Sequence, residues 1–99
     1  MNQKAREYIL DQLKELHIRV EGIKIRYEFN DDLNTHLVEV LPLSLYEDNQ
    51  EYILAEMEFE EEFRTEFPEE EILFVSADSL NQVENASFSF PYQVIDRSF

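Results

Sequence analysis

Apolar residues in the first part of the chain recur at the spacing of a helix. Over residues 3–16 the apolar positions share one helical stripe, made of Ala5, Ile9, Leu13 and Leu16. Charged residues occupy the other positions. The pattern predicts an amphipathic helix that ends near His17, where the period changes.

Residues 18–29 then alternate between apolar and polar side chains, which predicts a half-buried strand. One face of this strand holds Ile23, Ile25, Tyr27 and Phe29. Gly22, the only glycine, is expected to mark a bulge near its start. Residues 30–34 have the composition of a turn, and residues 35–41 form a second strand that buries Val38 and Val40.

The two strands have one pairing that keeps a continuous apolar face. It pairs Phe29 with His36, Tyr27 with Val38, and Ile25 with Val40. The same register brings Glu39 opposite Arg26 on the other face. We expect that face to be wet, with Lys24 and Glu28 beside the Arg26–Glu39 pair. A shift by one residue would place Ile25 against Glu39.

The second half of the chain begins with a predicted helix over residues 49–66. Asp48 and Glu51 have the spacing of an N-terminal capping box, and Phe67 before Pro68 predicts the end of the helix. Residues 71–77 are a continuous apolar run, which predicts a strand covered on both faces and therefore central in the sheet. The crossover through the helix is long enough for a parallel connection.

The chain is expected to end with a loop or short helical turn over residues 78–84 and a last strand within residues 86–96, centred on residues 86–90. The elements together predict a single α+β domain over residues 1–99, in the order α-β-β-α-β-β. We expect two helices to pack on one face of a mixed, mainly antiparallel sheet of about four strands.

The net charge of −15 is concentrated in the second half of the chain. Residues 1–40 contain eight acids and six bases, whereas residues 41–99 contain fifteen acids opposed by only Arg64 and Arg97. Such a field repels phosphate backbones and anionic lipids and attracts basic proteins. The sequence therefore predicts a basic protein partner, with neither nucleic acid nor a membrane among its ligands.

The predicted location is the cytoplasm. No segment approaches about 18 consecutive apolar residues, the N-terminus lacks the apolar core of a signal peptide, and the absence of cysteine suits a reducing compartment.

The acidic helix offers the first candidate site. Its aromatic stripe holds Tyr52, Phe59, Phe63 and Phe67, and glutamates point away from that stripe. This outer face is either a solvated surface or a docking surface for a basic partner. The candidate partner-binding residues are Glu58, Glu61, Glu62 and Glu66.

Glu56 offers the second candidate site, because its position falls within the aromatic stripe. A carboxylate there must reach water, pair or take up a proton, since an unpaired buried charge is costly. Its available partners are Arg64, Lys24, His36 or a tyrosine hydroxyl. A ligand-binding or catalytic pocket would combine Glu56 with His36 and Tyr27.

Other chemistry finds little support in the sequence. The chain has no cysteine, no serine in a GxSxG setting and too few glycines for a phosphate-binding loop. Its two histidines lack zinc-site spacing, and residues 30–34 lack the pattern of an EF-hand. We therefore expect no cofactor, no metal and no enzymatic activity.

Three functional hypotheses remain at the level of sequence. The leading one is a protein-interaction or regulatory module that binds a basic partner. Small acidic immunity proteins and antitoxins are similar to this chain in size and charge only, so an inhibitor of that kind is one form of this class. The alternative is a small ligand-binding protein or enzyme with a helix–sheet pocket around Glu56 and His36. The third is a homo-oligomer joined by a sheet edge or by the aromatic residues Phe88, Phe90, Tyr92 and Phe99.

Overall fold

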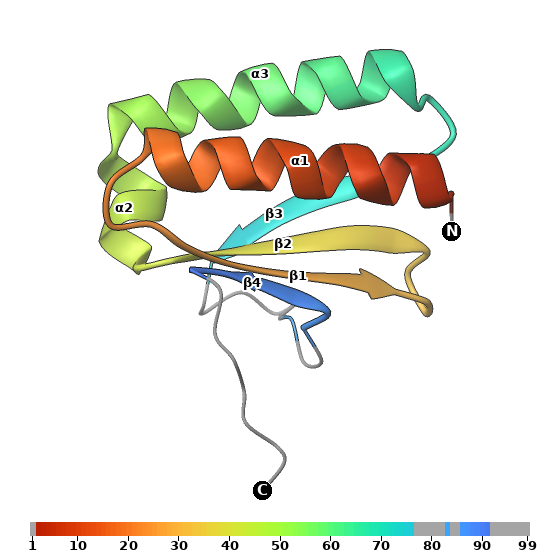
Figure 1. The fold of residues 1–99 in the computed structure, drawn as a ribbon, viewed down its shortest axis with the longest axis horizontal. Helices are drawn as coiled ribbons and strands as arrows, with labels where there is room; N and C mark the ends of the chain where they lie inside the picture. The colour runs from red at the N-terminus through yellow and green to blue at the C-terminus, as the bar shows by residue number, and fades with distance from the viewer. Residues whose placement is uncertain (1, 77–82, 84–85, 92–99) are drawn as a thin grey trace, which may run out of the picture.

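Two long helices cover one face of a four-stranded mixed sheet (Figure 1). The structure is a computed structural model that describes residues 2–76, 83 and 86–91. The elements are α1 (Gln3–Arg19), β1 (Lys24–Asn30), β2 (Thr35–Leu41), α2 (Leu43–Asp48), α3 (Gln50–Glu66), β3 (Ile72–Ser76) and β4 (Phe88–Phe90). The predicted α+β class is confirmed, and the short helix α2 is an addition to it.

Helix α1 buries the predicted stripe of Ala5, Ile9, Leu13 and Leu16. Asn2 caps its N-terminus, because the side-chain oxygen accepts hydrogen bonds from the backbone N–H groups of Lys4 and Ala5 at 2.9 and 3.2 Å. The helix runs to Arg19, two residues beyond the predicted end near His17. Gly22 then lies in the turn before β1 with a φ of 85°, so the expected bulge within the strand was wrong.

The predicted hairpin register is confirmed along the whole of β1 and β2. Phe29 pairs with His36, Tyr27 with Val38, and Ile25 with Val40. On the opposite face, Nη1 of Arg26 contacts Oε1 of Glu39 at 2.8 Å. Glu39 is nevertheless only 3% exposed, so the expectation that this whole face is wet was wrong. Buried Leu37, Val75 and Val83 lie outside the main core, which shows that apolar groups also cover part of this face.

Helix α3 ends where predicted, with Phe67 as its C-cap, but it begins at a different cap. The side chain of Asn49 accepts a hydrogen bond from the backbone N–H of Tyr52 at 2.9 Å, while Asp48 is the last residue of α2. The expected capping role of Asp48 was therefore wrong. The short helix α2 intervenes because the chain turns at Pro42 and buries Leu45 beside α3.

The sheet order is β3-β2-β1-β4, with β2 and β3 parallel and the other pairs antiparallel. The parallel crossover is confirmed, but β3 lies at an edge and its predicted central position was wrong. Its apolar run arises because Phe74 packs under α3 while Val75 is buried on the opposite face; Leu73 remains 38% exposed. The last strand is shorter than expected. Residues 77–82, 84–85 and 92–99 lie outside the described residues, and they include most of the predicted loop over 78–84 as well as Tyr92 and Phe99.

Candidate functional site: an acidic hollow between two helices

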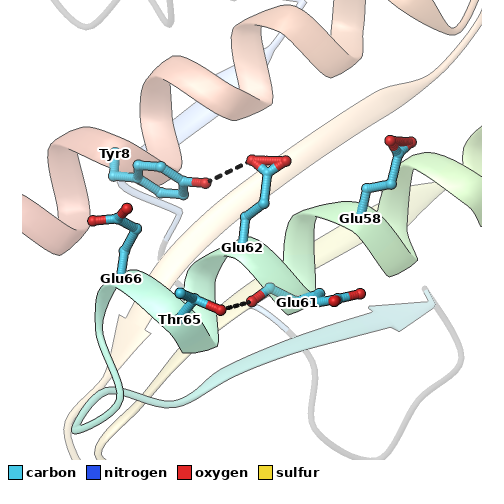
Figure 2. A pocket seen from close by; sticks show the side chains of 6 residues that line it. All are labelled: Tyr8, Glu58, Glu61, Glu62, Thr65 and Glu66. Carbon is cyan, nitrogen blue, oxygen red and sulfur yellow. Dashed lines mark hydrogen bonds between the residues drawn. The ribbon is translucent and has the colours of Figure 1, made fainter.

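A hollow of about 420 Å³ lies along the junction of α1 and α3 (Figure 2). We call it the acidic hollow and define it by its lining residues: Tyr8, Glu58, Glu61, Glu62, Thr65 and Glu66. Tyr8 comes from α1 and the others come from α3. All four glutamates that the sequence singled out for partner binding therefore line the same hollow.

The helical repeat of α3 explains why the acids gather there. Glu58, Glu62 and Glu66 are separated by four residues, so they follow one side of the helix. The side of α3 that faces the core buries Tyr52, Ala55, Phe59 and Phe63. Packing of this buried stripe holds the like charges together, although each pair of carboxylates at this spacing destabilises the helix by a few tenths of a kcal/mol.

Tyr8 forms the wall of the hollow that α1 contributes. Its ring lies edge-on to Phe59 and Phe67, with ring centroids 6.2 and 5.6 Å away. Its hydroxyl donates a hydrogen bond to Oε2 of Glu62 at 3.3 Å. Partial burial raises the pKa of Tyr8, and the charges of Glu62 and Glu66 raise it further. The hydroxyl is thus a donor set among carboxylates, which the sequence did not reveal because Tyr8 lies far from α3 along the chain.

Basic side chains reach only the margins of the acidic hollow. Arg19 contacts Glu51 at 3.2 Å and Glu58 at 3.5 Å, and Arg64 contacts Glu60 at 3.8 Å. These pairs are mostly exposed, so each contributes less than about 1 kcal/mol. Within the part of the chain that the structure describes, the carboxylates of Glu61 and Glu66 make no ion pair. The hollow therefore keeps an uncompensated negative charge.

Glu56 lies at the margin of the aromatic stripe, where Ala55 occupies the buried position. The hydroxyl of Tyr52 donates a hydrogen bond to its Oε1 at 2.9 Å. Of the four partners considered, the tyrosine hydroxyl is therefore the one observed. Burial raises the pKa of Glu56, the hydrogen bond from Tyr52 opposes that rise, and the nearby Glu60 adds to it.

His36 belongs to a separate chain of hydrogen bonds inside the molecule. Its Nδ1 lies 2.7 Å from the hydroxyl of Tyr27, and its Nε2 lies 2.7 Å from Oε1 of Glu70. His36 is fully buried. The aromatic rings of Phe29 and Phe63 lie edge-on to the imidazole.

The surroundings determine which nitrogen of His36 holds the proton. Burial raises the pKa of Tyr27 to about 12, so its hydroxyl remains protonated and donates to Nδ1. Nε2 therefore carries the hydrogen and donates to the carboxylate of Glu70. Burial also lowers the pKa of His36, and Glu70 opposes that shift only in part.

The structure thus joins two members of the second candidate site and separates the third. Tyr27 and His36 share a hydrogen bond, whereas Glu56 accepts its hydrogen bond from Tyr52. Glu70 completes the chain, and sequence reasoning missed it because three consecutive glutamates at 69–71 have no feature that distinguishes one from another. The acidic hollow is lined by none of Tyr27, His36 and Glu56.

Among the described residues, no group of three or more histidine, cysteine, aspartate or glutamate side chains has the geometry to hold a metal ion. The helices formed by those residues are also too short or too polar to cross a bilayer.

The fold and its site define a small α+β protein with an acidic hollow between two helices. Comparisons with protein-family models, with curated proteins and with solved structures find no match.

Proposed function

We propose that this protein is an interaction module that binds a basic protein through the acidic hollow. The observation that carries the proposal is the convergence of Glu58, Glu61, Glu62 and Glu66 on one hollow beside Tyr8. A concave surface lets several carboxylates contact the same cationic group, which a flat acidic face does not.

The charges favour a partner over a purely solvated surface. The like-charged side chains of Glu58, Glu62 and Glu66 repel one another along α3, and a lysine or arginine placed among them would relieve that repulsion. Arginine has the better geometry for this role, because its planar guanidinium can bond two carboxylates at once. The ring of Tyr8 adds an aromatic surface against which a guanidinium can stack.

The class of partner follows from the same charges. A basic loop or helix of another protein complements the hollow, whereas nucleic acid shares its sign of charge and is repelled. An inhibitor of a basic enzyme, in the manner of an immunity protein or antitoxin, is one form of this function. The proposal assigns binding rather than catalysis to the protein. It places the protein in the cytoplasm, which a cysteine-free chain suits.

The test captures proteins on immobilised wild-type chain at 50 mM NaCl and measures the affinity of each recovered protein. The hollow variant carries E58Q, E61Q, E62Q and E66Q. The control variant carries E15Q, E21Q, D31N and D32N, which remove the same charge from exposed positions outside the hollow. Loss of four charge pairs should lower the affinity of the hollow variant about tenfold or more. The affinity of the control variant should decrease by less than about twofold.

Ionic strength provides a second criterion. The affinity should decrease steeply between 50 and 300 mM NaCl, because exposed charges separated by more than a Debye length are screened. A partner that binds both variants equally, or whose affinity is independent of salt, would contradict the proposal.

A further inference from the structure

A second hollow, of about 580 Å³, lies on the other side of α1, where the helix crosses β4. We call it the β4 groove, and its lining residues are Glu7, Leu10, Asp11, Lys14, Phe88 and Phe90. The aromatic rings and Leu10 form an apolar floor that is only partly buried against the core. The three charged residues of α1 are exposed along its rim.

The strand at the base of this groove is an edge strand of the sheet that the described residues form. β4 lies at the opposite edge of the sheet from β3 and pairs with β1 through Ile25–Phe90, Arg26–Ser89 and Tyr27–Phe88. Its other edge pairs with no strand formed by residues 2–76 or 86–91. An unpaired strand edge presents backbone donors and acceptors to another chain.

The phenylalanines of β4 turn toward α1. The guanidinium of Arg6 lies 4.8 Å from the centre of the Phe88 ring, and the ring of His17 lies 6.1 Å from that of Phe90. An apolar helix–strand groove and a strand edge that the described residues leave unpaired therefore occur on the same side of the molecule. Figure 1 shows β4 in blue on this side, beneath α1, while β3 forms the opposite edge of the sheet.

We propose that the β4 groove binds a second copy of this chain, with β4 pairing antiparallel to its counterpart about a two-fold axis at Ser89. Phe88 of each copy then lies opposite Phe90 of the other, and the two four-stranded sheets join into one. Phe88, Phe90 and Leu10 from both copies fill the space beneath the two α1 helices.

The spacing of the elements suits this arrangement. Helix α1 contacts both β1 and β4, so its axis lies near the boundary between these strands. With strands about 4.8 Å apart, pairing β4 with its counterpart places the two α1 axes about 10 Å apart. Helices that pack directly against each other are separated by about 8–10 Å, so the helices meet without a gap or a clash.

Two of the three rim charges on α1 are arranged to pair with a copy that runs in the opposite direction. Glu7 lies toward the N-terminal half of the helix and Lys14 toward the C-terminal half. An antiparallel neighbour centred near Leu10 brings Lys14 of each copy to Glu7 of the other, so two opposite-charge pairs form about the axis. A self-complementary surface of this kind is what a two-fold interface requires.

The acidic hollows do not obstruct such a dimer. They lie on the far side of α1 in each copy, so the two α3 helices are about 30 Å apart if adjacent helices pack at the usual distance. The Debye length at physiological ionic strength is about 8 Å, which screens their repulsion. Each hollow remains open to its own partner.

The first experiment measures the dimer dissociation constant by sedimentation at 1–200 µM protein in 150 mM NaCl. K14E and E7K are each expected to weaken the dimer about tenfold. E7K should do so even though it lowers the net negative charge, and with it the general repulsion between the copies. The combined variant E7K/K14E should recover the wild-type constant within about threefold. K24E makes the same charge change as K14E at an exposed lysine outside the groove, and it should leave the constant within about twofold.

The second experiment uses the absence of cysteine from the chain. The variant S89C places a single thiol beside the two-fold axis, where opposed Cα atoms of an antiparallel pair are about 4.5–5.5 Å apart and can be bridged. Mild oxidation should give a covalent dimer for S89C but not for S44C, which places the thiol at an exposed position on α2.

Three outcomes would overturn the proposal. One is a wild-type monomer at 200 µM, whether the groove is open or covered by other residues of the same chain. Another is a dimer that E7K/K14E does not restore. The third is equal crosslinking of S89C and S44C. Circular dichroism of each variant confirms that these surface substitutions leave the fold intact.

Discussion

At the scale of single residues, the molecule keeps its buried titratable groups neutral or bonded. His36 accepts from Tyr27 and donates to Glu70, an arrangement that requires an imidazole without a proton on Nδ1. A protonated His36 would direct an N–H at the hydroxyl hydrogen of Tyr27, which must then turn away. Burial disfavours the same charge, as the lowered pKa of His36 reflects.

This lowered pKa predicts a loss of stability in acid. Unfolded His36 takes up a proton near pH 6.5, whereas folded His36 does so only at lower pH. The stabilisation is therefore complete above pH 6.5 and is lost as the pH falls through the folded pKa. One proton contributes a slope of at most about 1.4 kcal/mol per pH unit to the free energy of unfolding.

Urea denaturation between pH 7.5 and 5 measures that slope. The variant His36→Gln should lower it, even if the variant is less stable throughout. His17→Gln is the matched substitution at the other histidine. Identical slopes in wild type and His36→Gln would contradict the assignment.

At the scale of elements, α3 combines a strongly buried face with an acidic one. The residue that caps this helix therefore affects the stability of the fold. The cap that begins it is Asn49, one residue after the position that the sequence indicated. Asp48 is instead the last residue of α2, so the N-cap of α3 falls one residue later. The two adjacent residues therefore have different structural roles despite similar capping propensity.

Alanine substitutions distinguish these roles. Asn49→Ala removes the acceptor for the N–H of Tyr52 and should lower the free energy of unfolding by about 1 kcal/mol. Asp48→Ala, at an exposed position without that bond, should cost less than about 0.5 kcal/mol. Chemical denaturation at pH 7 compares the two, and a larger effect of Asp48→Ala would restore the capping box that the sequence predicted.

At the scale of the whole molecule, a net charge of −15 on 99 residues makes self-repulsion a general term in stability. The charge is uneven, because α3 carries much of it and few bases lie nearby. The acidic hollow and the β4 groove lie on opposite sides of α1 and differ in character. The first is lined mainly by carboxylates, whereas the second has an apolar floor with two aromatic rings and a rim of mixed charge.

Salt should therefore stabilise the folded protein. Raising NaCl from 50 to 500 mM shortens the Debye length from more than about 10 Å to about 4–5 Å and screens the repulsion along α3. The midpoint of thermal unfolding should rise. The rise should be smaller for the variant E58Q/E61Q/E62Q/E66Q than for E15Q/E21Q/D31N/D32N. If the midpoint rose equally in both variants, the charges of α3 would contribute no more to the effect of salt than charges elsewhere.

Local periodicity in the sequence alone determined the register of the hairpin and the buried faces of the two long helices. Alternation placed Tyr27 and Val38 on one face of the hairpin, since a shift by one residue would expose every apolar side chain. The helical period found the buried stripes of α1 and α3, and the Phe67–Pro68 pair found the end of α3. The same period grouped the four glutamates that line the acidic hollow, because residues four apart share one side of a helix.

The tertiary structure decided what covers each surface. It placed β3 at an edge, buried Glu39, enclosed His36 and brought Glu70 to it from 34 residues away. It also set Tyr8 against α3 and left the edge of β4 beside α1. A sequence pattern records which positions are apolar, whereas burial depends on which distant segment lies against them, and that is determined only when the helices and the sheet pack together.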